Sequence, residues 1–205
     1  LAGTSLCAMD LLPALVVSAC MNTNPMMVYF GQELGERGMD CEGFSGQDGR
    51  TTIFDYWTVD SLRRWDNDGH FNTGLLTPEE CELRAYYLHV LNLCRREKAL
   101  AEGQFFDLMY VNTDNWAMNA HRQYAFLRKS KKEVLLVVVN FDAAEAHISL
   151  NLPQHAFEYF EMAPQEKCKA KDLMTGKAET LSFTWEHPVA LDLPGYGAKI
   201  LKIKC

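Results

Sequence analysis

The sequence predicts two structural classes in succession: an α/β part made of a helix, a buried parallel strand and a second helix, followed by an all-β antiparallel sandwich. Three observations support this fold class. An uninterrupted apolar run, residues 26–30, lies between Pro25 and Gly31, which is typical of a buried parallel strand. Helical periodicity is present on both sides of that run. Beyond Gly103 the pattern changes to short strands separated by turns.

The first predicted element is a helix that ends before Pro25. Apolar residues recur every three or four positions from Leu6 to Cys20, with Pro13 either early in the helix or kinking it. Residues 22–25, Asn-Thr-Asn-Pro, end it. A helix, a short loop and an apolar strand in this order form the αβ half of a βα repeat.

Residues 33–68 form a long polar stretch after the strand. It contains nine acidic residues, four arginines and five glycines. Loops of this length in a compact domain are usually functional or disordered. The aromatic residues Tyr56, Trp57 and Trp65 favour a functional loop, because disordered segments contain few aromatics.

A second helix is predicted over residues 79–99. Thr77 is its expected N-cap, Pro78 occupies the first helical position, and Glu80 completes a capping box. Basic residues near the other end complement the helix dipole, and Gly103 follows.

Nine short strands are predicted after Gly103, with residues 134–139 in the central one. They cover residues 105–111, 123–128, 133–141, 147–152, 157–162, 167–174, 179–184, 189–193 and 198–204. Charge also changes at this point: residues 1–103 hold 8 Lys/Arg against 15 Asp/Glu, whereas residues 104–205 hold 12 of each. We therefore expect two domains, residues 1–103 and 104–205.

Composition excludes several classes of function. The acidic first part repels phosphate backbones, so we expect no nucleic-acid partner, and no apolar run is long enough for a membrane span. Seven cysteines without a C-x-x-C pair indicate reduced thiols that pack as small hydrophobic side chains, rather than a disulfide framework or a zinc site. The histidines are scattered, and no metal site or cofactor is predicted.

Three segments carry a resemblance to a known family. Residues 25–35 have the pattern Pro-x-x-x-Tyr-x-Gly-x-Glu-x-Gly, which resembles the last barrel strand of the α-amylase family, glycoside hydrolase family 13. Residues 172–176, Asp-Leu-Met-Thr-Gly, and 193–201, Leu-Pro-Gly-Tyr-Gly-Ala-Lys-Ile-Leu, resemble the end of that family's C-terminal β-domain. The resemblance implies that residues 1–103 are the last helix, strand and helix of a TIM-type (β/α)8 catalytic barrel.

The resemblance also implies retaining hydrolysis at α-glucosidic bonds, with an α-glucan or maltooligosaccharide as substrate. Such a mechanism needs two carboxyl groups about 5–5.5 Å apart. The family's Asn-His-Asp motif and its earlier catalytic motifs are not found in this sequence. We therefore expect the chain to be an interior piece of a longer enzyme, inactive alone, whose catalytic carboxylates lie in the N-terminal part of the barrel.

Five residues are expected to bind substrate rather than to catalyse. Gln32 and Glu33 follow the predicted strand, where the resemblance implies a site-wall or structural role. Glu33 is not expected to be catalytic, because it has no second carboxyl group with which to share the general-acid and general-base roles. The rings of Tyr56, Trp57 and Trp65 either stack on sugar faces or hold the loop against the barrel rim. Residues 66–69, Asp-Asn-Asp-Gly, lack the further ligands of a calcium loop and are expected to form a solvated turn; a structural calcium ion in the parent enzyme is not supported.

Two alternatives remain open at this point. One is a non-catalytic carbohydrate-binding or structural module with residues 104–205 as its sandwich, and the other is an α-glucan transferase of the same family. A single βα unit also leaves a parallel strand with two unpaired edges, so either an upstream segment or another copy must pair with it. The sequence does not indicate chain-length preference, bond type, compartment or oligomeric state.

Overall fold

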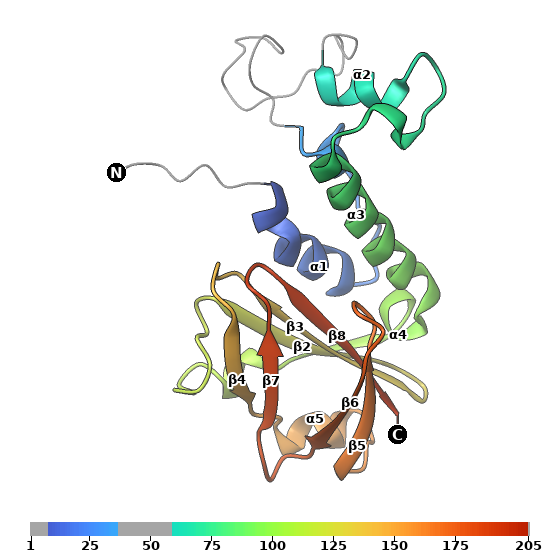
Figure 1. Cartoon of the computed structure of the whole chain (residues 1–205). Helices are drawn as coiled ribbons and strands as arrows, with labels where there is room; N and C mark the ends of the chain where they lie inside the picture. The colour runs from blue at the N-terminus through green and yellow to red at the C-terminus, as the bar shows by residue number, and fades with distance from the viewer. Residues whose placement is uncertain (1–7, 37–58, 205) are drawn as a thin grey trace. The chain divides into compact units, whose positions relative to one another are not determined.

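The computed structural model describes residues 8–36 and 59–204, which form two compact units (Figure 1). One unit comprises residues 8–24 and 90–204, and the other comprises residues 25–36 and 59–89. The smaller unit holds η2 (Gln32–Leu34), α2 (Asp60–Asp66), η4 (Thr73–Leu75) and the start of α3 (Pro78–Arg96). Among the described residues, no helix combines the length and the apolar character needed to cross a bilayer.

The larger unit contains all strands of the described chain, and every strand pair is antiparallel. Its helical elements are η1 (Ala8–Leu11), α1 (Leu12–Cys20), the end of α3, α4 (Lys98–Ala101), η5 (Met109–Val111) and α5 (Gln154–Tyr159). Its strands are β1 (Gln104–Asp107), β2 (Gln123–Ser130), β3 (Glu133–Asn140), β4 (Ala146–Leu150), β5 (Gln165–Asp172), β6 (Ala178–Phe183), β7 (Val189–Leu193) and β8 (Ala198–Lys204).

The strands form two layers around one apolar core. A six-stranded sheet has the order β1-β2-β3-β8-β5-β6, and a two-stranded sheet pairs β4 with β7. Side chains from both layers and from α5 fill the core, among them Leu136, Leu150, Phe157, Leu191 and Leu201. The prediction of an antiparallel all-β domain is therefore confirmed.

Strand β3 is central, as predicted, and both of its faces are buried. It pairs with β2 on one side and β8 on the other. Leu136 and Val138 point into the core between the layers, whereas Leu135 and Val137 point to the opposite face, because side chains alternate along a strand. Helices α1 and α4 pack on that opposite face (Figure 1). This double cover explains why the sequence of β3 is continuously apolar rather than alternating.

Arg128 of β2 lies on the helix-covered face and is 1% exposed. Its guanidinium donates four hydrogen bonds to backbone carbonyls: Nη1 to Met21 O at 2.7 Å, Nε to Ala99 O at 3.1 Å, and Nη2 to Leu100 O at 3.1 Å and Gly103 O at 2.8 Å. These carbonyls lie at the C-terminal ends of α1 and α4, where helix dipoles carry partial negative charge. Arg128 thus attaches the ends of both helices to the sheet.

A second polar cluster lies on the same face of the sheet. Lys202 Nζ is 2.6 Å from Glu97 Oε2 and 2.8 Å from Glu133 Oε2. The other Glu133 oxygen accepts the backbone N–H of Ala99 at 2.8 Å, which satisfies a donor in the first turn of α4. Burial opposes ionisation of Glu97, but hydrogen bonds from Lys202 and Arg96 outweigh it and hold the pKa of Glu97 below its ordinary value.

The predicted strand at residues 26–30 does not form within the described chain. These residues are not paired with any other described segment, and Met27 and Tyr29 are 81% and 52% exposed. A strand is stabilised by hydrogen bonds to its neighbours, and no parallel neighbour is present among the described residues. An apolar run alone therefore does not produce the strand.

Three further local predictions differ from the structure. Residues 157–162 were expected to form a strand, but α5 occupies 154–159, because Pro153 precedes it and Ala156, Phe157 and Phe160 bury one helical face. The predicted loop over residues 33–68 contains a helix, α2. The predicted strand at 105–111 is shorter, with β1 ending at Asp107 before η5.

Both predicted helices are present with different bounds, because η1 precedes α1 and because α3 ends at Arg96, before the predicted end at residue 99, with α4 after it. The family-like turn over residues 172–176 is also present. Helix α1 begins with Pro13 in its first turn, and α3 begins directly after Thr77. In the turn after β5, buried Asp172 accepts hydrogen bonds from Met174 N at 3.0 Å and Thr175 Oγ1 at 2.7 Å, and Gly176 has a φ of 79°. This geometry requires an acidic side chain first and glycine last, as in the Asp-Leu-Met-Thr-Gly segment.

The compact units do not divide at residue 103. Helices α1 and α4 pack against the sheet and belong to the same unit as the strands. The assignment of residues 1–103 to the end of a barrel, with a sandwich domain from residue 104, stays a prediction.

Replacing Arg128 tests its role in holding the helix ends. We expect Arg128→Ala to lower the free energy of unfolding by roughly 3 kcal/mol or more, because it leaves four carbonyl groups without their donor. Urea denaturation followed by circular dichroism measures the change. Arg122→Ala, at an exposed arginine of the same unit, is the control and should cost less than about 0.5 kcal/mol. A similar loss in both variants would contradict the assignment.

The lowered pKa of Glu97 predicts a loss of stability in acid. A carboxyl whose pKa is depressed in the folded state contributes stability above its unfolded pKa, near 4.5, and loses that contribution as the pH falls through the folded value. Unfolding free energies measured between pH 7 and pH 3 should fall less steeply in Glu97→Gln than in the unmodified chain. Glu82→Gln, at an exposed carboxylate of α3, should keep the original slope; an unchanged slope in Glu97→Gln would refute the prediction.

Candidate functional site

The Gly-Gln-Glu-Leu-Gly segment forms a tight turn in the smaller unit. Gly31 and Gly35 have φ values of 74° and 76°, the left-handed region, and they flank the single turn η2. A Cβ on Gly31 would lie 2.7 Å from Cβ of Glu36. Both glycines are therefore required by backbone conformation, and Gly31 is also required by close packing. Leu34 is buried beneath the turn.

Gln32 is fixed by two hydrogen bonds, although it is exposed. Its Oε1 accepts the backbone N–H of Tyr29 at 3.0 Å, and its Nε2 donates to the hydroxyl of Tyr87 at 2.9 Å. Burial raises the pKa of Tyr87, with the bond from Gln32 acting in the opposite direction. Gln32 thus joins the turn to α3, which is an anchoring role. Glu33 lies half-buried in the same turn.

Trp65 of α2 is half-buried, and the guanidinium carbon of Arg84 lies 3.9 Å from the centre of its ring. This cation–π contact occupies one face of the indole. Of the five expected substrate-binding residues, the structure describes Gln32, Glu33 and Trp65; Tyr56 and Trp57 lie outside the described residues. No contact places Trp65 together with Gln32 or Glu33 in the described part of the smaller unit.

The start of α3 is held by the predicted capping box. Glu80 N donates to Thr77 Oγ1 at 3.2 Å, and Thr77 N donates to Glu80 Oε2 at 2.9 Å. Arg64 of α2 also donates to both carboxylate oxygens of Glu80, with Nε–O distances of 3.2 and 3.0 Å. The bond to Glu80 raises the pKa of Arg64. Glu80 therefore serves as a helix cap and as an ion-pair partner at once.

Residues 66–69 form a turn, as predicted, and helix α2 ends at Asp66, the first residue of this turn. Asn67, Asp68 and Gly69 have φ values of 44°, 54° and 82°, and the Gly69 N–H donates to Asp66 Oδ2 at 3.3 Å. The short polar side chains tolerate these left-handed conformations. A surface hollow of about 630 Å³ beside the turn is lined by Asp60, Leu62, Arg63, Arg64, Asp66, Asn67, Asp68 and Leu75.

An aromatic patch on the larger unit was missed by the sequence analysis. We define it as Phe106, Tyr110, His155, Tyr159 and Phe160. The Phe106 ring lies at its centre, with centroid distances of 6.2 Å to Tyr110, 5.4 Å to His155 and 5.6 Å to Tyr159. Tyr110 and Tyr159 are 54% and 48% exposed.

The aromatic patch depends on α5, which explains why it was missed. His155 and Tyr159 are four residues apart and so lie on one face of that helix. The predicted strand over residues 157–162 contained Tyr159 but not His155, so the two side chains were not expected to lie together. Their i, i+4 spacing after Pro153 was the pattern that pointed to the correct arrangement.

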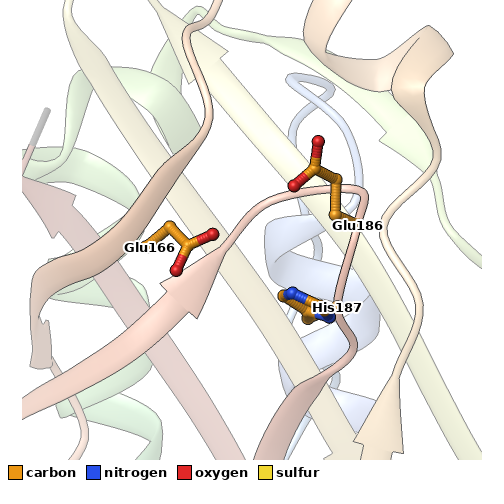
Figure 2. Close-up of side chains that lie close together, drawn as sticks. All are labelled: Glu166, Glu186 and His187. Atoms are coloured by element: carbon orange, nitrogen blue, oxygen red, sulfur yellow. The ribbon is translucent and has the colours of Figure 1, made fainter.

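Three exposed side chains of the larger unit resemble a ligand set for a metal ion. They are Glu166 of β5 and Glu186 and His187 from the turn after β6, and one ligand atom of each lies within 4.8 Å of the others (Figure 2). Carboxylates and imidazole suit divalent transition metals. Metal ligands are normally held in place by hydrogen bonds from neighbouring groups, and no such side-chain bond orients these three in the described chain. The cluster alone does not make a metal site.

The family of the larger unit follows from a sequence comparison. Residues 113–204 match the family model of the alpha amylase C-terminal all-beta domain. Residues 113–204 are thus the C-terminal all-beta domain of the α-amylase family. This match covers β2 to β8, so the strand order and the turn after Asp172 belong to a known domain. No curated protein shows significant sequence similarity to the whole chain.

Several solved structures share the fold of this chain. The structure of AmyP in complex with maltose matches with a TM-score of 0.60 at 18% identity, covering 95% of this chain and 34% of that one. The α-amylase of Geobacillus thermoleovorans complexed with acarbose matches with 0.58 at 16% identity, over 97% and 34%. The trehalulose synthase MutB of Pseudomonas mesoacidophila MX-45 matches with 0.53 at 19% identity, over 97% and 38%. The chain therefore spans little more than a third of these proteins.

These comparisons confirm the resemblance to the α-amylase family that the sequence suggested. They do not assign roles to Gln32, Glu33 or Trp65, which precede the matched α-amylase C-terminal domain. The aromatic patch lies partly within the domain, because His155, Tyr159 and Phe160 fall inside residues 113–204 and the other two rings precede it.

Proposed function

We propose that the chain is part of a retaining glycoside hydrolase that acts on α-glucans or maltooligosaccharides, with the catalytic carboxylates outside these 205 residues. The observation that supports this most is the α-amylase C-terminal domain at residues 113–204. The Asn-His-Asp motif of the family is not found in the sequence, and retaining chemistry needs two facing carboxyl groups.

In this proposal residues 1–103 contribute the last helix, strand and helix of the catalytic barrel. Residues 26–30 become a strand when a neighbouring parallel strand supplies the hydrogen bonds that they lack in the described chain. The fixed turn at Gly31–Gly35 then lies at the carboxyl end of that strand, where barrel enzymes place their substrate sites. Gln32 and Glu33 form part of the site wall, and Tyr56, Trp57 and Trp65 belong to its rim.

Hydrolysis and transfer differ in this family only in the acceptor of the glucosyl group. A trehalulose synthase stands among the structures that share this fold, beside the α-amylases. We place hydrolysis first because the solved structures that share this fold include an α-amylase complexed with acarbose, and an α-glucan transferase is the alternative within the same proposal.

The missing carboxylates give the first test of the proposed function. Residues 1–205 alone should release no reducing sugar from maltoheptaose above the level of buffer, whereas the same residues joined to the family's upstream barrel segment should release it. Reducing-end release over several hours is the measurement. Turnover by residues 1–205 alone would refute the proposal that the catalytic groups lie elsewhere.

A second candidate function, carbohydrate binding by the β-domain itself, is favoured by the aromatic patch. Pyranose rings present flat C–H faces that pack on aromatic side chains, while tyrosine hydroxyls and imidazole supply hydrogen-bond partners. Tyr110 and Tyr159, whose rings both lie near that of Phe106, expose about half of their surface. Such binding requires no catalytic carboxylate, so it is compatible with an inactive chain.

Calorimetric titration with maltoheptaose tests this second function. If the aromatic patch binds sugar, Tyr110→Ala and Tyr159→Ala should each weaken binding about tenfold or more, which is the usual effect of removing a stacking ring of this size. Trp116→Ala removes a ring that is 97% exposed and lies outside the patch, and it should leave the affinity unchanged. Equal effects of all three substitutions, or no binding by the unmodified chain, would rule out the patch.

A further inference from the structure

Two cysteines of the larger unit lie in direct contact. Cys20 is the last residue of α1, and Cys94 lies in the last turn of α3. Their sulfur atoms are 3.7 Å apart, and Cys94 Sγ is also 3.3 Å from the carbonyl oxygen of Ala19. Cys20 is fully buried, whereas Cys94 is partly exposed. Of the two residues, only Cys94 keeps exposed surface, and the sulfur of buried Cys20 is in contact with its sulfur.

The two sulfur atoms have different environments. The hydrogen bond with Cys94 and burial raise the pKa of Cys20 well above that of an ordinary thiol. The hydrogen bond from Cys20 and the positive charge of Arg128 lower the pKa of Cys94, against the effect of burial. The same guanidinium that binds the helix ends therefore favours the thiolate of the more exposed cysteine. A thiolate, and not a thiol, is the nucleophile in sulfur chemistry.

The position of the pair in the chain gives the contact a structural consequence. The smaller unit begins at residue 25, shortly after Cys20, and ends at residue 89, shortly before Cys94. Both cysteines belong to the larger unit. Cys20 lies just before the chain enters the smaller unit, and Cys94 lies just after the chain comes back to the larger unit. A covalent link between them closes a loop that contains the whole smaller unit.

We propose that Cys20 and Cys94 are a thiol oxidation site, at which a peroxide converts the two cysteines into a disulfide that fixes both ends of the smaller unit. The thiolate of Cys94 attacks one oxygen of hydrogen peroxide; an S–O bond forms, the O–O bond breaks, and hydroxide leaves. The sulfur of Cys20 then attacks the sulfur of the Cys94 sulfenic acid. An S–S bond forms, the S–O bond breaks, and the leaving hydroxide takes up the proton of the Cys20 thiol to give water. Two thiols are oxidised by two electrons in total, and one peroxide is reduced to two waters.

Peptide mapping after peroxide treatment tests the pairing. The reduced full chain is treated with hydrogen peroxide, the remaining thiols are alkylated, and tryptic peptides are analysed by mass spectrometry. Cys94 lies in the peptide of residues 85–95, and Cys20 in that of residues 1–37, which also contains Cys7, so the experiment uses a Cys7→Ser background. We expect a linked pair of these peptides, two hydrogens lighter than their sum, that disappears on reduction.

Single substitutions separate the roles of the two cysteines. In Cys20→Ser, dimedone should trap a sulfenic acid on Cys94, because the second sulfur is missing. In Cys94→Ser, no sulfenic acid should form on buried Cys20. Cys81→Ser, which removes another free thiol of α3, is the matched control and should leave the linked peptide unchanged.

The linked chain should also unfold at a higher temperature than the reduced chain, by up to roughly 10 °C, because the disulfide closes a long loop. This shift should be absent in Cys20→Ser and Cys94→Ser and present in Cys81→Ser. The proposal is overturned if peroxide oxidises Cys94 to sulfinic acid without linking it to Cys20, if Cys94 is linked to another cysteine, or if Cys20 is the residue trapped by dimedone.

Discussion

The buried guanidinium of Arg128 is the interaction on which the larger unit depends. Its hydrogen bonds go to backbone carbonyls at the ends of α1 and α4, so helix dipoles and not a carboxylate balance much of its charge. An arginine is suited to this position because its planar group presents several donors in fixed directions, which a lysine does not. The side chain of Arg128 thereby holds the C-terminal ends of two helices against strand β2.

The apolar outer face of β3 explains why α1 and α4 belong to the same unit as the sheet. Leu135 and Val137 of β3 face α1 and α4, so removing those helices would expose an apolar face of the central strands. Glu97, Glu133 and Lys202 add a charged cluster beside this face. The six-stranded sheet therefore requires cover on both sides, one from the second layer of strands and one from helices that come earlier in the chain.

The two candidate binding regions differ in how they are built. The turn around Gln32 is held by local constraints, namely two left-handed glycines and hydrogen bonds to Tyr29 and Tyr87. The aromatic patch is assembled from β1 and η5, which are neighbours in sequence, and from α5, which comes much later in the chain. A local turn keeps its shape whatever surrounds it, which makes it suitable as part of a site completed by other segments. An assembled patch is complete within its own unit and needs no further segment to bind a ligand.

The sequence by itself determined the elements whose stabilisation is local or strictly periodic. The capping box of Thr77 and Glu80 set the start of α3, and the alternation in β7 set its strand. The aspartate turn after β5 carried a family resemblance that the match to the α-amylase C-terminal domain confirms. Tertiary structure decided the rest. Residues 26–30 are apolar enough for a buried strand, yet a strand exists only with partners to pair it, and the described chain offers none. Likewise, nothing near Arg128, Cys20 or Cys94 in the sequence indicates that they meet, because burial and contact depend on how distant segments pack together.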